Sequence, residues 1–218
     1  KSLAALRRGG ICDQVGGGFH RSATDREWLV PHFEKMLYDQ AQLASSYLDA
    51  FLLSGDRQFA DMAREIFAYV LRDLTDPGGG FYSAEDADSD DPYSPGVHGE
   101  GAFYLWTEEE IDRVLPAADA GIFKYSYGIL PGGNAQEDPQ GEFKGRNILY
   151  ISRSQEEAAR QFAERGCAYR TSSKRSACGW GLRSTVQRST VSPVKNSSTR
   201  RGSTPSSCYL TRRAPPPR

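Results

Sequence analysis

The distribution of acidic residues divides this 218-residue chain into two parts with different folding potential. All 28 Asp and Glu residues lie at or before Glu164, whereas residues 166–218 hold 11 Lys and Arg and no acid. Because charged residues make up about a quarter of an ordinary protein, so long a stretch without one acid is rare. The first 165 residues carry 16 basic and 28 acidic groups, a net charge of −12, and the tail carries +11. We therefore predict a partial domain over residues 1–165 and a separate tail over residues 166–218.

The composition of the tail indicates that it has no packed core. It has 17 Ser and Thr, ends in Ala-Pro-Pro-Pro-Arg, and its sparse apolar residues follow neither a helical nor a strand period. Its cysteines, Cys167, Cys178 and Cys208, match no zinc pattern and support no disulfide framework. Three interpretations remain: a disordered linker, a basic arm for nucleic acid, and translation in a wrong reading frame. We favour the last, and a nucleic-acid partner has the least support because such arms concentrate their charge more tightly.

The first part begins with a predicted helix over residues 31–53. Pro31 suits a first helical position, and Ser54-Gly55 would end the helix. Apolar residues recur between them at spacings of three and four: Phe33, Leu37, Ala41, Ala44, Leu48 and Phe51.

A second helix is predicted over residues 56–74, with Asp56 as its N-cap and Asp-Pro-Gly-Gly-Gly at its end. A short turn joins it to the first helix, so the two helices should form an antiparallel hairpin. Its apolar stripe comprises Phe59, Met62, Ala63, Ile66, Phe67, Val70, Leu71 and Leu74.

The remaining elements are shorter. Two aromatic stretches, residues 80–83 and 102–106, predict a small β-hairpin with the acidic loop between them as an insertion. Thr107 and the three Glu after it are typical of the start of a helix, which should run to about residue 115. A strand over residues 147–151 and a last helix after Ser154 follow. Helix pairs with one small hairpin predict an all-α fold of the toroid or solenoid type, which one pair cannot close.

The first candidate site lies at the predicted start of the first helix. At 100° per residue, His32, Lys35 and Asp39 fall within about 60° of one another on the helix surface. They could bind a polar ligand, with His32 as proton donor or acceptor, and a solvated helix face is the alternative. The glycine triplet at residues 16–18 lacks the preceding strand and the Gly-Lys-Ser/Thr ending of a phosphate loop.

The second candidate site is the acidic stretch between residues 81 and 91. Its alternating aspartates mimic a calcium loop, but Asp91 stands where that loop requires glycine and Val97 where it requires glutamate. Carboxylates beside aromatic rings also fit a sugar site, because rings pack on sugar C–H faces while carboxylates perform acid/base or nucleophilic chemistry. A solvated acidic loop is the alternative.

Both clusters lie within longer runs that resemble a known family, the thioredoxin-domain-containing proteins related to spermatogenesis-associated protein 20. The runs are Gly-Gly-Gly-Phe-His-Arg at 16–21, Glu-Trp-Leu-Val-Pro-His-Phe-Glu-Lys-Met-Leu-Tyr-Asp at 27–39, Gly-Gly-Phe-Tyr-Ser-Ala-Glu-Asp-Ala-Asp-Ser at 79–89, Gly-Ala-Phe-Tyr-Leu-Trp-Thr-Glu-Glu-Glu-Ile at 101–111, and Glu-Phe-Lys-Gly-Arg-Asn-Ile-Leu at 142–149. Runs of this kind, in order over residues 9–162, are highly specific.

The resemblance implies a thioredoxin-like domain, missing upstream of this chain, followed by a six-hairpin (α/α)6 toroid of the glycosidase and sugar-epimerase type. This chain would hold about the first third of that toroid, with the β-hairpin inserted and a disordered tail attached. The parent protein is then expected to be a carbohydrate-active enzyme, with hydrolase and epimerase mechanisms both open, and the truncated chain to be inactive. A non-catalytic, redox-linked or scaffold protein whose toroid only binds is the alternative.

On this basis Asp86 or Asp88 is expected to be one carboxylate of a hydrolase, and His32 or His20 the proton shuttle of an epimerase. The expected substrate-binding residues are His20, Trp28, Lys35, Tyr38, Asp39, Tyr82 and Glu85. No cofactor or metal is expected, because the three histidines are too scattered for a metal site. No apolar run is long enough to span a membrane and no signal peptide opens the chain, so we expect a cytoplasmic protein. The first residue, Lys1, suggests a fragment.

Overall fold

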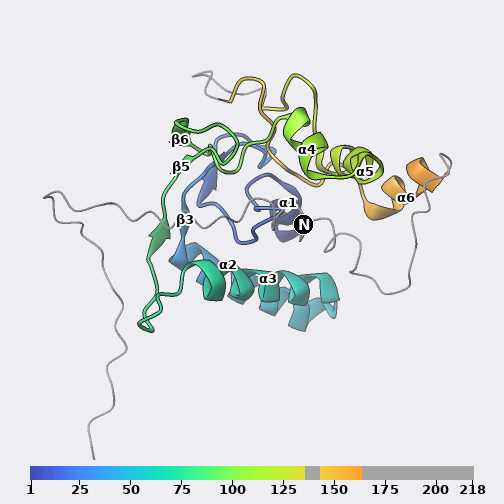
Figure 1. The fold of residues 1–218 in the computed structure, drawn as a ribbon. Helices are drawn as coiled ribbons and strands as arrows, with labels where there is room; N and C mark the ends of the chain where they lie inside the picture. The colour runs from blue at the N-terminus through green and yellow to red at the C-terminus, as the bar shows by residue number, and fades with distance from the viewer. Residues whose placement is uncertain (136–142, 164–218) are drawn as a thin grey trace, which may run out of the picture.

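The structure, a computed structural model, describes residues 1–135 and 143–163. Figure 1 shows α2 and α3 side by side at one end of the molecule and α4 and α5 at the other, with the N-terminal segment between them. The described helices are α1 (Ser2–Arg8), α2 (Leu37–Ser54), α3 (Arg57–Asp73), α4 (Glu108–Val114), α5 (Ala117–Tyr127) and α6 (Gln155–Ala163).

Short antiparallel strands accompany these helices. They are β1 (Ser22–Ala23), β2 (Pro31–His32), β3 (Lys35–Met36), β4 (Ala84–Glu85), β5 (Asp88–Asp90) and β6 (His98–Glu100), and they pair as β1–β2, β3–β4 and β5–β6. The prediction of an all-α toroid is therefore wrong, because the described residues form a mixed fold of helices and small sheets. The predicted tail, residues 166–218, lies outside the described residues.

The first long helix begins later than predicted. It starts at Leu37, because residues 31–36 are extended: Pro31 and His32 pair with β1, and β3 pairs with β4. His32 and Lys35 therefore do not share a helix face with Asp39, and this part of the prediction is wrong. The predicted end is confirmed, since Gly55 is left-handed with φ 70° and donates its N–H to the carbonyl of Phe51.

The helical hairpin and its second helix are confirmed. Asp56 caps α3 by accepting a hydrogen bond from the Gln58 amide at 3.0 Å. One core cluster lies between α2, α3 and the N-terminal segment, and its buried residues are Ile11, Cys12, Phe19, Ala44, Tyr47, Met62, Ala63 and Ile66. Phe67 and Leu71 do not join this core, since they are 52% and 65% exposed.

The aromatic stretches do not pair with one another as predicted. The hairpin lies inside the acidic segment instead, where β5 pairs with β6 and Ser89 lies opposite Gly99. Its connection is closed by Asp91, whose carboxylate accepts the amides of Tyr93 and Ser94 and whose own amide donates to the carbonyl of Val97. These bonds close the hairpin within the acidic segment.

The last elements follow the predicted signals in part. Thr107 and Glu110 form a capping box at α4, and Ser154 and Glu157 exchange the same reciprocal bonds at α6. The strand predicted over residues 147–151 is reduced to a single bridge between Asn147 and Trp106. A second core cluster fills the space between α4, α5 and this segment, with Trp106, Ile111, Leu115, Ala120, Phe123, Tyr127, Ile129 and Leu149 buried.

Gly18 gives the first testable prediction. Its φ is +76°, and a Cβ there would lie 2.5 Å from the Tyr69 ring. We expect Gly18→Ala to lower the free energy of unfolding by about 2–4 kcal/mol, from left-handed strain and overpacking together. Gly99→Ala is the control, because nothing lies within 4 Å of the position that its added methyl group would take. Urea denaturation followed by circular dichroism measures both, and equal midpoints would contradict the expectation.

Candidate functional site

The candidate site is built around a buried lysine. Lys35 in β3 is only 1% exposed, and its ammonium lies 2.7 Å from Asp13 Oδ2 and donates to the Gly17 carbonyl at 3.0 Å. The same nitrogen lies over two aromatic rings, 4.5 Å from the centroid of Tyr69 and 4.8 Å from that of Tyr104. A buried charge is tolerated only when it is paired and hydrogen-bonded, and this one is both.

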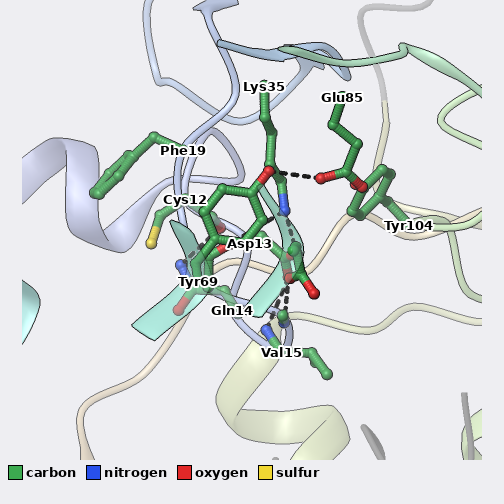
Figure 2. Close-up of polar contacts among 12 residues, drawn as sticks. Cys12, Asp13, Gln14, Val15, Phe19, Lys35, Tyr69, Glu85 and Tyr104 are labelled. Carbon is green, nitrogen blue, oxygen red and sulfur yellow. Dashed lines mark hydrogen bonds and ion pairs between the residues drawn. The ribbon is translucent and has the colours of Figure 1, made fainter. Parts of the chain in front are cut away.

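Glu85 completes the polar cluster from the opposite strand. The β3–β4 register places Glu85 directly across from Lys35. Figure 2 shows its carboxylate accepting hydrogen bonds from the hydroxyls of Tyr69, at 2.6 Å, and Tyr104. Two phenol donors and a nearby ammonium therefore fix this carboxylate in one orientation.

The pKa shifts keep Lys35 and Asp13 charged and the two tyrosines neutral. Burial by itself would lower the pKa of Lys35, but the carboxylates of Asp13 and Glu85 outweigh it and raise the pKa. Burial likewise opposes ionisation of Asp13, yet the Lys35 ammonium lowers the pKa of that carboxyl overall. Burial and the Glu85 charge raise the pKa of Tyr69 and Tyr104 well above the ordinary value, so both phenols remain protonated donors.

His20 is buried beside the cluster in a neutral form. Its ring packs edge-on against Phe33 and Tyr104, with centroid distances of 5.2 and 4.9 Å. Burial, and then the Lys35 charge, lower the pKa of His20 to about 3. His20 is only 3% exposed, and among the described residues its buried Nδ1 has no hydrogen-bond partner.

The glycine triplet shapes the loop that supplies Asp13. Asp13 Oδ1 accepts the amides of Val15 and Gly16 at 3.0 and 2.8 Å, and Gly17 and Gly18 adopt φ values near +79° and +76°. The loop turns tightly and presents its carboxylate to Lys35. These glycines therefore serve a turn that holds an anion of the protein itself.

A cavity of about 640 Å³ opens onto this cluster. Its wall brings together five of the predicted site residues from three separate stretches of the sequence: His20, Lys35, Glu85, Asp86 and Asp88. Aromatic residues complete the wall: Phe33, Phe103, Tyr104 and Trp106.

The other five predicted residues do not line the cavity. His32 in β2 lies with its Nδ1 3.5 Å from Glu100, and Tyr82 donates its hydroxyl to Asp76. Trp28 and Tyr38 are exposed, and Asp39 has one buried oxygen, Oδ2, without a hydrogen-bond partner among the described residues. Their roles stay predictions.

Three residues of the cluster were not predicted: Asp13, Tyr69 and Tyr104. Asp13 precedes a glycine triplet, which is a turn signal, but the sequence does not indicate that its second oxygen meets Lys35. Tyr69 lies outside the expected apolar stripe of its helix. Only the packing of α3 against the N-terminal loop reveals either contact.

Arg146 attaches the acidic hairpin to α4 beside the cavity. Its guanidinium lies 2.7 Å from Asp91 Oδ2 and 3.2 Å from Glu110 Oε1. Both carboxylates are at least 95% buried, and Asp91 directly follows β5. This clamp holds the segment that carries Asp86 and Asp88 in place next to the cavity.

The described part of the chain, residues 1–135 and 143–163, has no group of three or more His, Cys, Asp or Glu arranged to hold a metal ion. Within the same residues, no helix is long and apolar enough to cross a membrane.

The chain is similar to a set of known proteins, although no family model matches it. It is 47% identical over 173 residues to spermatogenesis-associated protein 20 of Homo sapiens, which covers 74% of this chain and 22% of that relative. The protein of the same name from Mus musculus is 46% identical with the same coverage. The uncharacterized protein B0495.5 of Caenorhabditis elegans is 37% identical over 73% of this chain and 23% of its own length. The chain thus spans about a fifth of the length of the curated relatives it matches.

The Lys35–Asp13 pair gives the second prediction. Lys35→Met leaves the Asp13 carboxylate buried without its cation, so we expect a loss of roughly 3–5 kcal/mol in the free energy of unfolding near pH 7. Lys124→Met is the matched control, because Lys124 pairs with two more exposed carboxylates, Glu108 and Asp112, and should cost about 1 kcal/mol or less. Urea denaturation of both variants and the wild type measures the difference.

The sign of the pH dependence is a further check. In the wild type the lowered pKa of Asp13 stabilises the fold above the unfolded pKa, and this stabilisation is lost as the pH falls through the folded pKa. In Lys35→Met the unpaired Asp13 carboxyl takes up a proton more readily. The difference in the free energy of unfolding between the wild type and this variant should therefore shrink as the pH falls. If the loss in the free energy of unfolding is the same from neutral to acid pH, the unpaired Asp13 carboxylate is not its cause.

Proposed function

We propose that this chain supplies one wall of the sugar site of a carbohydrate-active enzyme. The observation that carries the proposal is the cavity of about 640 Å³, whose wall combines aromatic rings with carboxylates. This volume falls in the range of small-molecule sites, which pair apolar walls with a few oriented polar groups. The cavity therefore has room for a sugar ring. Its aromatic residues suit the C–H face of the sugar, and its carboxylates suit the hydroxyl groups.

The aromatic residues offer surfaces for the C–H face of a sugar. Phe103 is 37% exposed and packs edge-on against Tyr104, with centroids 5.2 Å apart. Tyr104 in turn stacks on Phe33 at 5.7 Å. A supported, partly open ring of this kind can accept a sugar face at little entropic cost, since its side chain is already ordered.

Asp86 and Asp88 are the carboxylates available to a substrate. Both are exposed at the cavity, and among the described residues neither forms an ion pair. Glu85, by contrast, is held by two tyrosines and Asp13 by Lys35, so these two are suited to positioning. In a hydrolase, Asp86 or Asp88 would act as acid, base or nucleophile at the glycosidic bond.

This arrangement favours carboxylate chemistry over an epimerase that uses His32. His32 lies off the cavity wall, whereas both aspartates lie on it. His20 also lines the wall, but burial lowers its pKa to about 3, so it is a weak proton acceptor for an epimerase. The names of the relatives state no reaction, and the chain covers about a fifth of their length, so the activity of the whole protein is part of the proposal. The thioredoxin-like partner domain implied by the resemblance is likewise proposed.

Sugar titrations of the 218-residue chain test this proposal. A panel of neutral and amino hexoses and their oligomers should include a ligand that binds saturably, measured by calorimetry or by NMR shifts. Asp86→Asn and Asp88→Asn should each weaken it about tenfold or more, because each removes a charged hydrogen-bond acceptor. Asp49→Asn, an exposed carboxylate in α2 that does not line the cavity, should leave binding unchanged. Failure of every sugar to bind would overturn the proposal.

A further inference from the structure

The cavity wall has an excess of negative charge. Seven of its residues are Asp or Glu, whereas Lys35 and Arg72 are its only Lys or Arg among the described residues. Four of the seven lie within ion-pair distance of a basic side chain: Asp13 with Lys35, Asp73 with Arg72, Asp90 with His98 and Asp91 with Arg146. Neither Asp86 nor Asp88 has such a partner in the described part of the chain.

The floor of the same cavity already binds an ammonium group. Lys35 Nζ is held by one carboxylate, one carbonyl and the faces of two tyrosines. This coordination shows that acids and ring faces of this site compensate the desolvation of a primary amine. Asp86 directly follows Glu85 in the chain and offers the same type of acceptor, a carboxylate, nearer to solvent.

His20 adds an uncharged ring to the wall rather than a third cation. The ring lines the cavity, is 3% exposed, and has a buried Nδ1 without a hydrogen-bond partner among the described residues. Burial, and then the Lys35 charge, lower the pKa of His20, so the ring adds little repulsion to a positive ligand.

We propose that the preferred ligand of this cavity is a hexose with a protonated amino group, held between the Asp86 and Asp88 carboxylates and the aromatic wall. This inference rests on the proposed sugar site and narrows its substrate class to cationic amino sugars. A neutral sugar would use the aromatic faces equally well but would leave the two free carboxylates without a counter-charge.

The test compares glucosamine, N-acetylglucosamine and glucose on the 218-residue chain by calorimetry. The measurements are made at a pH about two units below the pKa of the glucosamine amine, where glucosamine is positively charged and N-acetylglucosamine and glucose are neutral. We expect glucosamine to bind at least about tenfold more tightly than either neutral sugar, the effect of one charge-assisted contact. We also expect added salt to weaken glucosamine binding and to leave the neutral sugars unaffected.

The variants separate charge from shape. Asp86→Asn with Asp88→Asn should abolish the preference for glucosamine, while Asp49→Asn should keep it. Equal affinity of the three sugars in the wild type would overturn this inference and leave the proposed sugar site intact. If neither these three sugars nor any other sugar binds, both the inference and the proposed sugar site are overturned. The wild-type comparison and its salt dependence decide the outcome even if the double variant fails to fold.

Discussion

The burial of the Lys35 ammonium is the constraint on which this structure depends. Compensating one charge inside the protein requires groups from four segments: the loop at Asp13 and Gly17, the strand β4 at Glu85, the helix α3 at Tyr69, and Tyr104 after β6. Asp13, Gly17 and the two tyrosine rings contact the nitrogen itself, and Glu85 acts as a nearby negative charge held by the two tyrosine hydroxyls. The ion pair therefore organises tertiary structure as much as it adds stability, and the cavity opens directly onto it.

The same constraint explains why the first helix starts late. A helix over residues 31–36 would not present the extended backbone edge with which a neighbouring strand pairs. As β3, the segment instead pairs with β4 and brings Glu85 opposite Lys35. Long-range pairing with a charged partner thus outweighs a helical apolar pattern, as tertiary contacts commonly outweigh local propensity.

The carboxylates of the acidic segment and of the first turn of α4 fall into two groups, one buried in ion pairs and one exposed to solvent. Asp91 and Glu110 are buried and satisfied by Arg146, so they anchor the hairpin, whereas Asp86 and Asp88 remain accessible at the cavity. Neighbouring acids therefore have different roles, decided by which of them meets a cation. The exposed pair has no ion-pair partner among the described residues and is accessible to a ligand at the cavity.

The sequence by itself determined the local features: the caps at Asp56 and Thr107, the end of α2 at Gly55, and the helical hairpin, because each depends on residues within a few positions. Its motifs also pointed to five residues that meet at the cavity. Only the tertiary structure decided the late start of α2, the position of the β-hairpin, and the joining of Asp13 and Tyr69 to Lys35. These features depend on pairing across tens of residues and on the energetic need to satisfy a buried charge, which local sequence patterns do not encode.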